Sequence, residues 1–148
     1  MSEIELLYQD LVVDHSREPH NFRILVNADH VARGHNPLCG DEVTVFLNMD
    51  QDRIQEITFQ GSGCAISKAS ASIMTESVKK LDKASIEKLF VNFHQMVTGE
   101  KKDRDQIEKL GKLAVFQGVS EFPVRVKCAT MPWHTLKAAL ESTSEVNV

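Results

Sequence analysis

The residues with the most distinctive chemistry are three cysteines, Cys39, Cys64 and Cys128, and one carboxylate, Asp41. Each cysteine lies at a break between expected elements: Cys39 in the loop "NPLCGD", Cys64 where a strand gives way to a helix, and Cys128 just before the last helix. A thiol at a helix start lies near unpaired N–H groups, which favour the thiolate. Three thiolates and one carboxylate suit a tetrahedral, borderline-soft metal; zinc is the commonest, and iron–sulfur chemistry is the other option.

Other interpretations of the cysteines are weaker. Any single one could be a small buried apolar residue. Their odd number and wide separation argue against a disulfide framework, and the absence of a CxxC pair argues against a zinc knuckle or redox pair. Among the histidines, His35 and His134 are candidates to approach the site, whereas His15 and His20 are expected to be solvated or at the core edge.

Composition limits the broad class of the protein. The 148 residues, 42% of them hydrophobic, are enough for one domain, which we expect to span residues 1–148. A formal net charge of −4 provides no basic surface, so neither nucleic acid nor a membrane is an expected partner. The sequence contains no apolar run of the roughly 18 residues that a spanning helix needs. We expect a cytoplasmic protein.

Apolar periodicity predicts an α+β fold. Ser2 and Glu5 have the spacing of a capping box, and one-face apolar spacing from Ile4 to Val12 then indicates a first helix. Alternation on both sides of "DQD" predicts an antiparallel hairpin. Further segments are a helix from Cys64, a helix over 86–97, a weaker helical pattern over 107–118, an extended "PVRVKC" and a last helix from about Thr130.

Three segments carry a resemblance to a known family. "NPLCGD", "GSGCAISKASAS" and "FPVRVKCATMPWHTL" resemble the three cysteine motifs of the IscU and SufU proteins of iron–sulfur cluster assembly, also called NifU-like scaffolds. The similarity covers nearly the whole chain. It implies a small antiparallel sheet covered on one face by helices, with the three cysteines and Asp41 at one exposed end.

Two features resemble the SufU branch of that family. Lys127 stands where IscU-type members carry a histidine, and a lysine ammonium is a poor metal ligand at neutral pH. The 63 residues between Cys64 and Cys128 also exceed the IscU-type spacing, with the extra length expected near residues 99–118, for docking or packing. The branch implies Zn2+ bound by Cys39, Asp41, Cys64 and Cys128.

The same resemblance implies partners and a role. The protein would act like a sulfurtransferase, taking persulfide sulfur from a SufS-type cysteine desulfurase and working with other Suf assembly proteins. Cys39 would leave the zinc when the desulfurase docks and attack the enzyme's persulfide, with Gly40 providing mobility. Arg125 is either a contact for this partner or a solvated surface residue.

Two alternatives stay open. In the first, the chain is a scaffold on which a transient [2Fe–2S] cluster is assembled and transferred, with Asp41 keeping the cluster labile. Lys127 counts against it, because it replaces the usual fourth scaffold ligand. In the second, the chain holds an inert structural zinc, which the absence of a CxxC pair disfavours.

Overall fold

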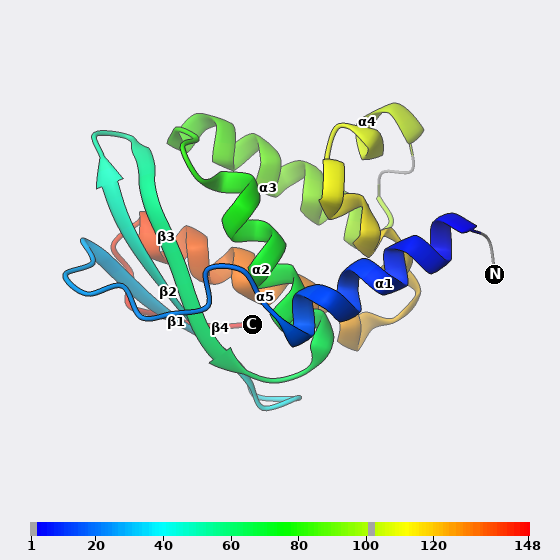
Figure 1. The fold of residues 1–148 in the computed structure, drawn as a ribbon, viewed down its shortest axis with the longest axis horizontal. Coiled ribbons are helices and arrows are strands. Elements are labelled where there is room, and N and C mark those ends of the chain that lie inside the picture. The colour runs from blue at the N-terminus through cyan, green and yellow to red at the C-terminus, as the bar shows by residue number, and fades with distance from the viewer. Residues whose placement is uncertain (1–2, 101–102) are drawn as a thin grey trace.

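The fold has two layers, a sheet and a set of helices packed against one of its faces (Figure 1). The computed structural model describes residues 3–100 and 103–148, so Ser2 of the expected capping box lies outside the described residues. The elements, in chain order, are α1 (Glu3–Arg17), β1 (His30–Asn36), β2 (Asp41–Asp50), β3 (Arg53–Ser62), α2 (Ala65–Val78), α3 (Lys83–Val97), α4 (Arg104–Glu108), the 3₁₀ helix η1 (Gly111–Glu121), α5 (Pro123–Leu140) and β4 (Glu145–Asn147). This α+β arrangement confirms the predicted class.

The sheet has the strand order β3-β2-β1-β4. β2 pairs antiparallel with both β3 and β1, so the predicted hairpin is confirmed. The short β4 adds a parallel pair to β1 and makes the sheet mixed. Asn36 pairs with Asp41, so residues 37–40 form a tight connection between β1 and β2. The first cysteine motif is therefore a hairpin turn.

Apolar periodicity predicts no strand over residues 30–36, whereas the structure has strand β1 there. Its buried residues are Ala32, Gly34 and Asn36, which are small or polar and give no apolar alternation. Gly34 is needed for packing, because a Cβ there would collide with the Thr135 hydroxyl of α5. This strand is thus defined by a close helix contact, not by apolar side chains.

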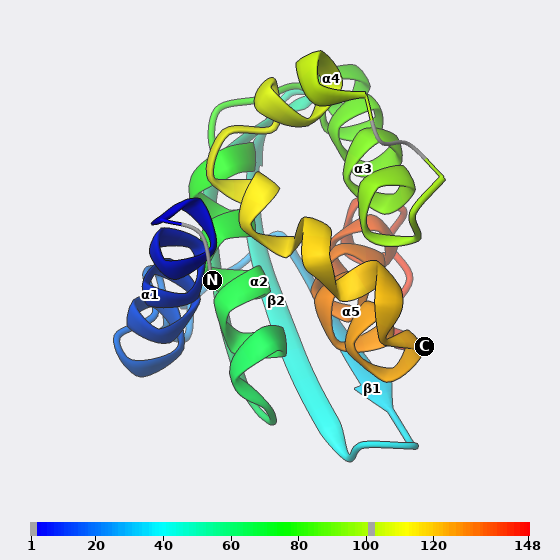
Figure 2. The same cartoon turned by 90° about the vertical axis from the view of Figure 1, so that its right-hand side faces the viewer.

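Helices α2 and α5 contact each other, α5 lying against β1 and β2 and α2 against β3 (Figure 2). The buried residues of α2 are mostly small, and Ser70 Oγ donates a hydrogen bond of 2.5 Å to the Ala129 carbonyl of α5. Small side chains allow this close approach of the two helices. Among the described residues, no helix combines the length and apolar character that crossing a membrane requires.

The last helix begins earlier than predicted. Residues 123–128 are helical and not extended, because α5 starts at Pro123. Proline suits the first position of a helix, where the backbone N–H has no partner within the helix. Pro132 consequently lies inside the helix and not in its first turn. Its missing N–H cannot bond the carbonyl four residues earlier, which belongs to Cys128. Cys128 therefore lies within a helix.

The segment over residues 99–118 contributes to the core. It continues into η1, whose Leu113 and Phe116 side chains are fully buried. The Phe116 ring meets Phe93 of α3 edge-on at 6.0 Å between centroids, and Phe93 stacks on Trp133 of α5 at 4.8 Å. Of the two expected roles, docking or packing, the structure supports packing.

Replacement of Phe116 tests this packing role. Phe116→Ala is expected to lower the free energy of unfolding by about 3–5 kcal/mol, because it removes a fully buried ring and leaves a cavity. Urea unfolding followed by circular dichroism measures the change. The neighbouring exposed residue supplies the control, since Gln117→Ala should change stability by no more than about 0.5 kcal/mol. Equal effects of the two substitutions would contradict a core role for η1.

Candidate metal centre

The four expected site residues come from three parts of the fold and meet at one point. Cys39 lies in the β1–β2 turn, Asp41 begins β2, Cys64 is the N-cap of α2, and Cys128 lies in α5. Ligand atoms of Cys39, Asp41 and Cys128 all lie within 4.8 Å of one another. The Cys64 sulfur lies outside this closest trio but only 3.7 Å from Asp41 Oδ2. All three cysteines are free thiols.

Asp41 lies at the centre of the group. Its side chain is buried, with 2% of the residue exposed, and Oδ1 accepts a hydrogen bond of 3.0 Å from the Cys64 backbone N–H. Gly63 makes this approach possible. Its φ of +151° is rare for other residues, and a Cβ there would collide with the Asp41 carboxylate. The β3–α2 connection is therefore shaped around this carboxylate.

Cys64 and Cys128 are held by helices. The Cys64 sulfur accepts a hydrogen bond of 3.4 Å from the Ser67 N–H and so caps α2. Cys128 is only 3% exposed. Burial raises the pKa of the Cys128 thiol well above its usual value, and Asp41 and Cys64 raise it further through hydrogen bonds and charge. A thiolate at Cys128 thus requires a compensating positive charge, which a bound metal ion supplies.

Cys39 lies on a short turn and is exposed, as Cys64 also is. The Asn36 carbonyl accepts hydrogen bonds from the N–H groups of Cys39, at 3.2 Å, and Gly40, at 2.8 Å. The Asn36 side chain also accepts one from Leu38 N at 3.1 Å. Gly40 has φ +71° with open space around it, so the turn needs its backbone conformation, not its small size. One asparagine thus holds the turn that carries this thiol.

The other candidate residues lie elsewhere. His35 faces Glu42 across the β1–β2 pair, and the His134 ring packs against Phe90 at 5.3 Å between centroids. Neither histidine is among the described residues whose ligand atoms meet at the cysteines. Arg125 is not on an extended segment but in the first turn of α5, where its guanidinium carbon lies 4.6 Å from the centroid of the Phe122 ring.

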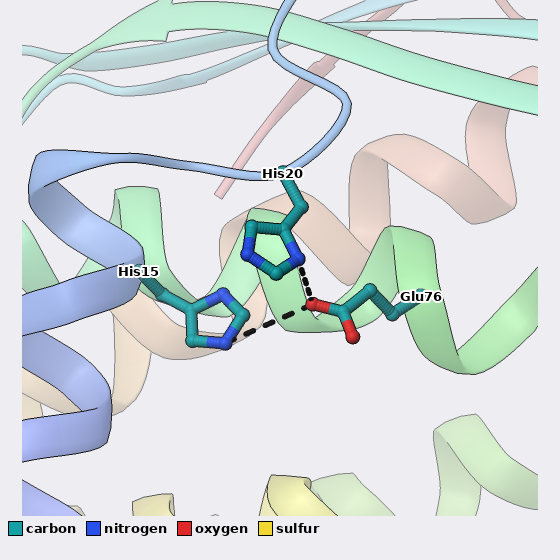
Figure 3. A group of neighbouring side chains, drawn as sticks. All are labelled: His15, His20 and Glu76. Carbon is teal, nitrogen blue, oxygen red and sulfur yellow. Dashed lines mark ion pairs between the residues drawn. The ribbon is translucent and has the colours of Figure 1, made fainter.

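A second group of possible ligands was missed by the sequence interpretation. His15, His20 and Glu76 converge, and their ligand atoms lie within 4.8 Å of one another (Figure 3). His15 is buried instead of solvated. The two histidines form an H-x4-H spacing that also occurs in zinc sites, but Glu76 lies far away in the sequence. Only the packing of α1 against α2 brings them together.

Comparisons with known proteins agree on the family. The model of the NifU-like N terminal domain matches residues 7–141. A zinc-dependent sulfurtransferase SufU of Bacillus subtilis is 38% identical over 136 residues, covering 92% of this chain and 90% of that protein. An iron–sulfur cluster assembly scaffold protein IscU of Streptococcus pyogenes is 36% identical over 144 residues, covering 97% and 89%.

Solved structures with a similar fold include a protein named for the same family. The SUF-system scaffold protein FiSufU of Fervidobacterium islandicum has a TM-score of 0.82 at 35% identity, covering 92% of this chain and 98% of that chain. A NifU-like N-terminal structure from Brucella abortus has a TM-score of 0.82 at 19% identity, covering 95% and 96%, and shares the fold. The chain therefore belongs to the NifU-like N-terminal domain family of iron–sulfur cluster assembly, together with its IscU and SufU relatives.

Proposed function

We propose that this protein is a zinc-dependent sulfur acceptor that takes persulfide sulfur from a SufS-type cysteine desulfurase and passes it to other Suf assembly proteins. One observation carries the proposal: three thiols and a buried carboxylate from separate segments converge, and Cys39, one of the two exposed thiols, is on a turn. The family supports a role in iron–sulfur assembly, and the name of the Bacillus subtilis relative supports zinc and sulfur transfer.

Cys39, Asp41, Cys64 and Cys128 would hold the zinc. The donor set fits, since three sulfurs and one carboxylate oxygen complete a tetrahedral shell. The buried Asp41 and the raised pKa of the Cys128 thiol both favour a cation at this point. Bound zinc supplies the positive charge that keeps its ligand thiols deprotonated at neutral pH.

The proposed transfer is an exchange between thiols. The Cys39 thiolate attacks the outer sulfur of the desulfurase persulfide and forms a new S–S bond. The S–S bond of the enzyme persulfide breaks, and the enzyme cysteine leaves as a thiolate. One persulfide is consumed and one is formed, so no oxidant or reductant is needed.

The geometry favours Cys39 over the other two thiols for this step. Cys64 is also exposed, but its N–H is bonded to Asp41 and its sulfur to the first turn of α2. Cys128 is buried within α5. Either residue would have to break helical hydrogen bonds in order to meet an external persulfide. Cys39 is exposed, and Leu38 beside it is 72% exposed, so a partner can reach this turn.

Arg125 is our candidate contact for the desulfurase. It is exposed in the first turn of α5, the helix that carries Cys128. Its neighbours Phe122 and Val124 are also exposed apolar residues, 46% and 55% respectively. Apolar residues around an arginine are typical of contact surfaces between proteins.

A second candidate function is a scaffold for a [2Fe–2S] cluster, which would be cargo and not a resident cofactor. The name of the Streptococcus pyogenes relative favours it. Lys127 counts against it, because the ammonium has no lone pair for a metal. The two functions are distinguished by iron, sulfide and zinc analysis of protein purified without oxygen, together with desulfurase turnover with and without the protein.

Removal of a helix-held thiol tests the zinc site. The protein is expected to contain one zinc at the cysteines, and Cys64→Ala or Cys128→Ala should lose it and unfold at lower temperature, since metal binding contributes to folding stability. Elemental analysis and thermal unfolding measure both effects. Lys127→Ala is the control and should keep its zinc, because Lys127 is an exposed neighbour of Cys128. Full zinc content in both cysteine variants would refute the ligand set.

Gly63 provides a test that leaves every proposed ligand in place. Gly63→Ala should weaken zinc binding at the cysteines by about tenfold or more, because its Cβ would displace the Asp41 carboxylate. Competition with a chromogenic chelator measures the affinity. Gly118→Ala is the matched control, since nothing lies within 4 Å of a Cβ at that position. Unchanged affinity in Gly63→Ala would argue against Asp41 as a ligand.

The position of the transferred sulfur is a separate prediction. After incubation with the desulfurase and free cysteine, alkylation and peptide mass spectrometry should find the persulfide on Cys39. Cys39→Ser should lower desulfurase turnover to the level of the enzyme alone. The assignment is wrong if the persulfide is confined to Cys64 or Cys128, or if Cys39→Ser stimulates the enzyme as well as the unchanged protein does.

A further inference from the structure

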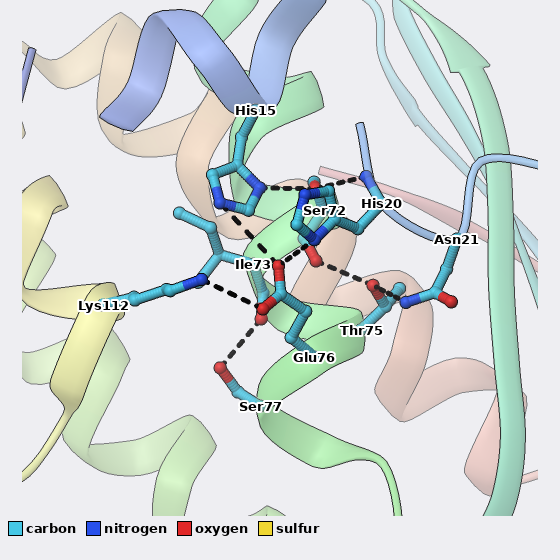
Figure 4. Close-up of polar contacts among 9 residues, drawn as sticks. All are labelled: His15, His20, Asn21, Ser72, Ile73, Thr75, Glu76, Ser77 and Lys112. Carbon is cyan, nitrogen blue, oxygen red and sulfur yellow. Dashed lines mark hydrogen bonds and ion pairs between the residues drawn. The ribbon is translucent and has the colours of Figure 1, made fainter. Parts of the chain in front are cut away.

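The group formed by His15, His20 and Glu76 is distinct from the cysteine site. His15 lies near the end of α1, His20 follows that helix, and Glu76 lies in the last turn of α2 (Figure 4). Cys64 caps the opposite end of α2. At 1.5 Å of rise per residue, the twelve positions from Cys64 to Glu76 separate the two groups by on the order of 18 Å.

Both imidazoles face one carboxylate oxygen. His20 Nδ1 lies 2.5 Å from Glu76 Oε1, and His15 Nε2 lies 3.7 Å from the same atom. The two rings lie 4.5 Å apart between centroids. Ligand atoms this close, from two histidines and a glutamate, form a donor set that zinc takes in proteins, with a fourth position left for water.

Ser72 holds the two histidines in place. Its Oγ lies 2.7 Å from His15 Nδ1 and accepts a hydrogen bond of 2.8 Å from the His20 backbone N–H. A serine oxygen can accept two hydrogen bonds, so it can also accept the Nδ1–H of His15. That tautomer leaves the Nε2 lone pair directed toward Glu76. Metal-binding histidines are usually oriented in this way, through their second ring nitrogen.

The charges around the group favour a metal with strong affinity for imidazole. Burial lowers the pKa of His15, with His20 and Lys112 adding to the effect and Glu76 and Asp14 opposing it. Lys112 Nζ bonds Glu76 Oε2 at 3.1 Å and leaves Oε1 for the histidines. Its positive charge disfavours any further cation, so weak oxygen-seeking ions such as Ca2+ and Mg2+ should not bind.

We propose that His15 Nε2, His20 Nδ1 and Glu76 Oε1 form a second metal site, for Zn2+ or a similar borderline transition-metal ion. The His20 side chain is 53% exposed, which gives the ion a path from solvent. Bound metal would join α1 and the segment after it to α2. The site does not depend on the proposed sulfur transfer.

Zinc counting on the full chain tests the second site. Dialysis against micromolar free Zn2+, followed by elemental analysis, should show one more zinc in the unchanged protein than in His20→Asn or Glu76→Gln. Each variant should bind this additional ion at least about tenfold more weakly. His30→Asn is the matched control and should keep the full count, because His30 lies in β1 outside the group. If the cysteine site does not bind zinc, the zinc count falls equally in all four proteins. The difference between the unchanged protein and the His20→Asn and Glu76→Gln variants then remains.

Lys112→Met separates a metal site from a network of hydrogen bonds. Removing the positive charge of Lys112 should strengthen binding of the additional zinc. If the group is only a network of hydrogen bonds, neither the unchanged protein nor Lys112→Met will bind an additional ion. Zinc should also raise the melting temperature of the protein with its cysteine site already filled, but not that of folded His20→Asn. The proposal is overturned if the unchanged protein and His20→Asn hold equal zinc, or if His30→Asn loses as much.

Discussion

The burial of the Asp41 carboxylate is the constraint on which the rest of the structure around the cysteines depends. A carboxylate that is 2% exposed is unfavourable unless donors or a cation compensate it. Cys64 provides two donors, its backbone N–H to Oδ1 and its thiol to Oδ2, and the β3–α2 connection reaches the carboxylate only because Gly63 has no Cβ. The remaining compensation is the positive charge that the neighbouring thiols would help to bind. The buried Asp41 carboxylate therefore destabilises the site when no cation is bound, and it stabilises a bound cation.

Close packing of the two layers brings the thiols to this carboxylate. Ser70 of α2 bonds the Ala129 carbonyl of α5, so the two helices approach at the residue next to Cys128. Gly34 of β1 lets α5 lie directly on the sheet through Thr135. Larger side chains at these contacts would move α5 and the buried cysteine away from Asp41. Positions that bear no chemistry of their own thus determine whether the proposed ligands meet.

Helix α2 connects both groups of possible metal ligands. Its first turn is capped by the Cys64 sulfur, and its last turn carries Glu76 between two histidines and Lys112. The middle of the helix is buried through small residues, so it is a rigid support between the two ends. Cys39, by contrast, lies on a turn in which Asn36 accepts the hydrogen bonds of residues 38–40. The proposed division into fixed ligands and one transferable thiol follows from this difference in support.

The sequence by itself determined which residues we propose as metal ligands and where most of the elements lie, because motifs and apolar periodicity are local properties. Cys39, Asp41, Cys64 and Cys128 were recognised from their positions at element breaks and from the family motifs. Only the tertiary structure decided that "HVARGHN" is a strand, since its buried residues are small or polar, and that α5 begins at Pro123 despite the alternating "VRV". It also decided that His15, His20 and Glu76 meet. Such contacts join residues far apart in the chain, and no local pattern records the distance between two packed surfaces.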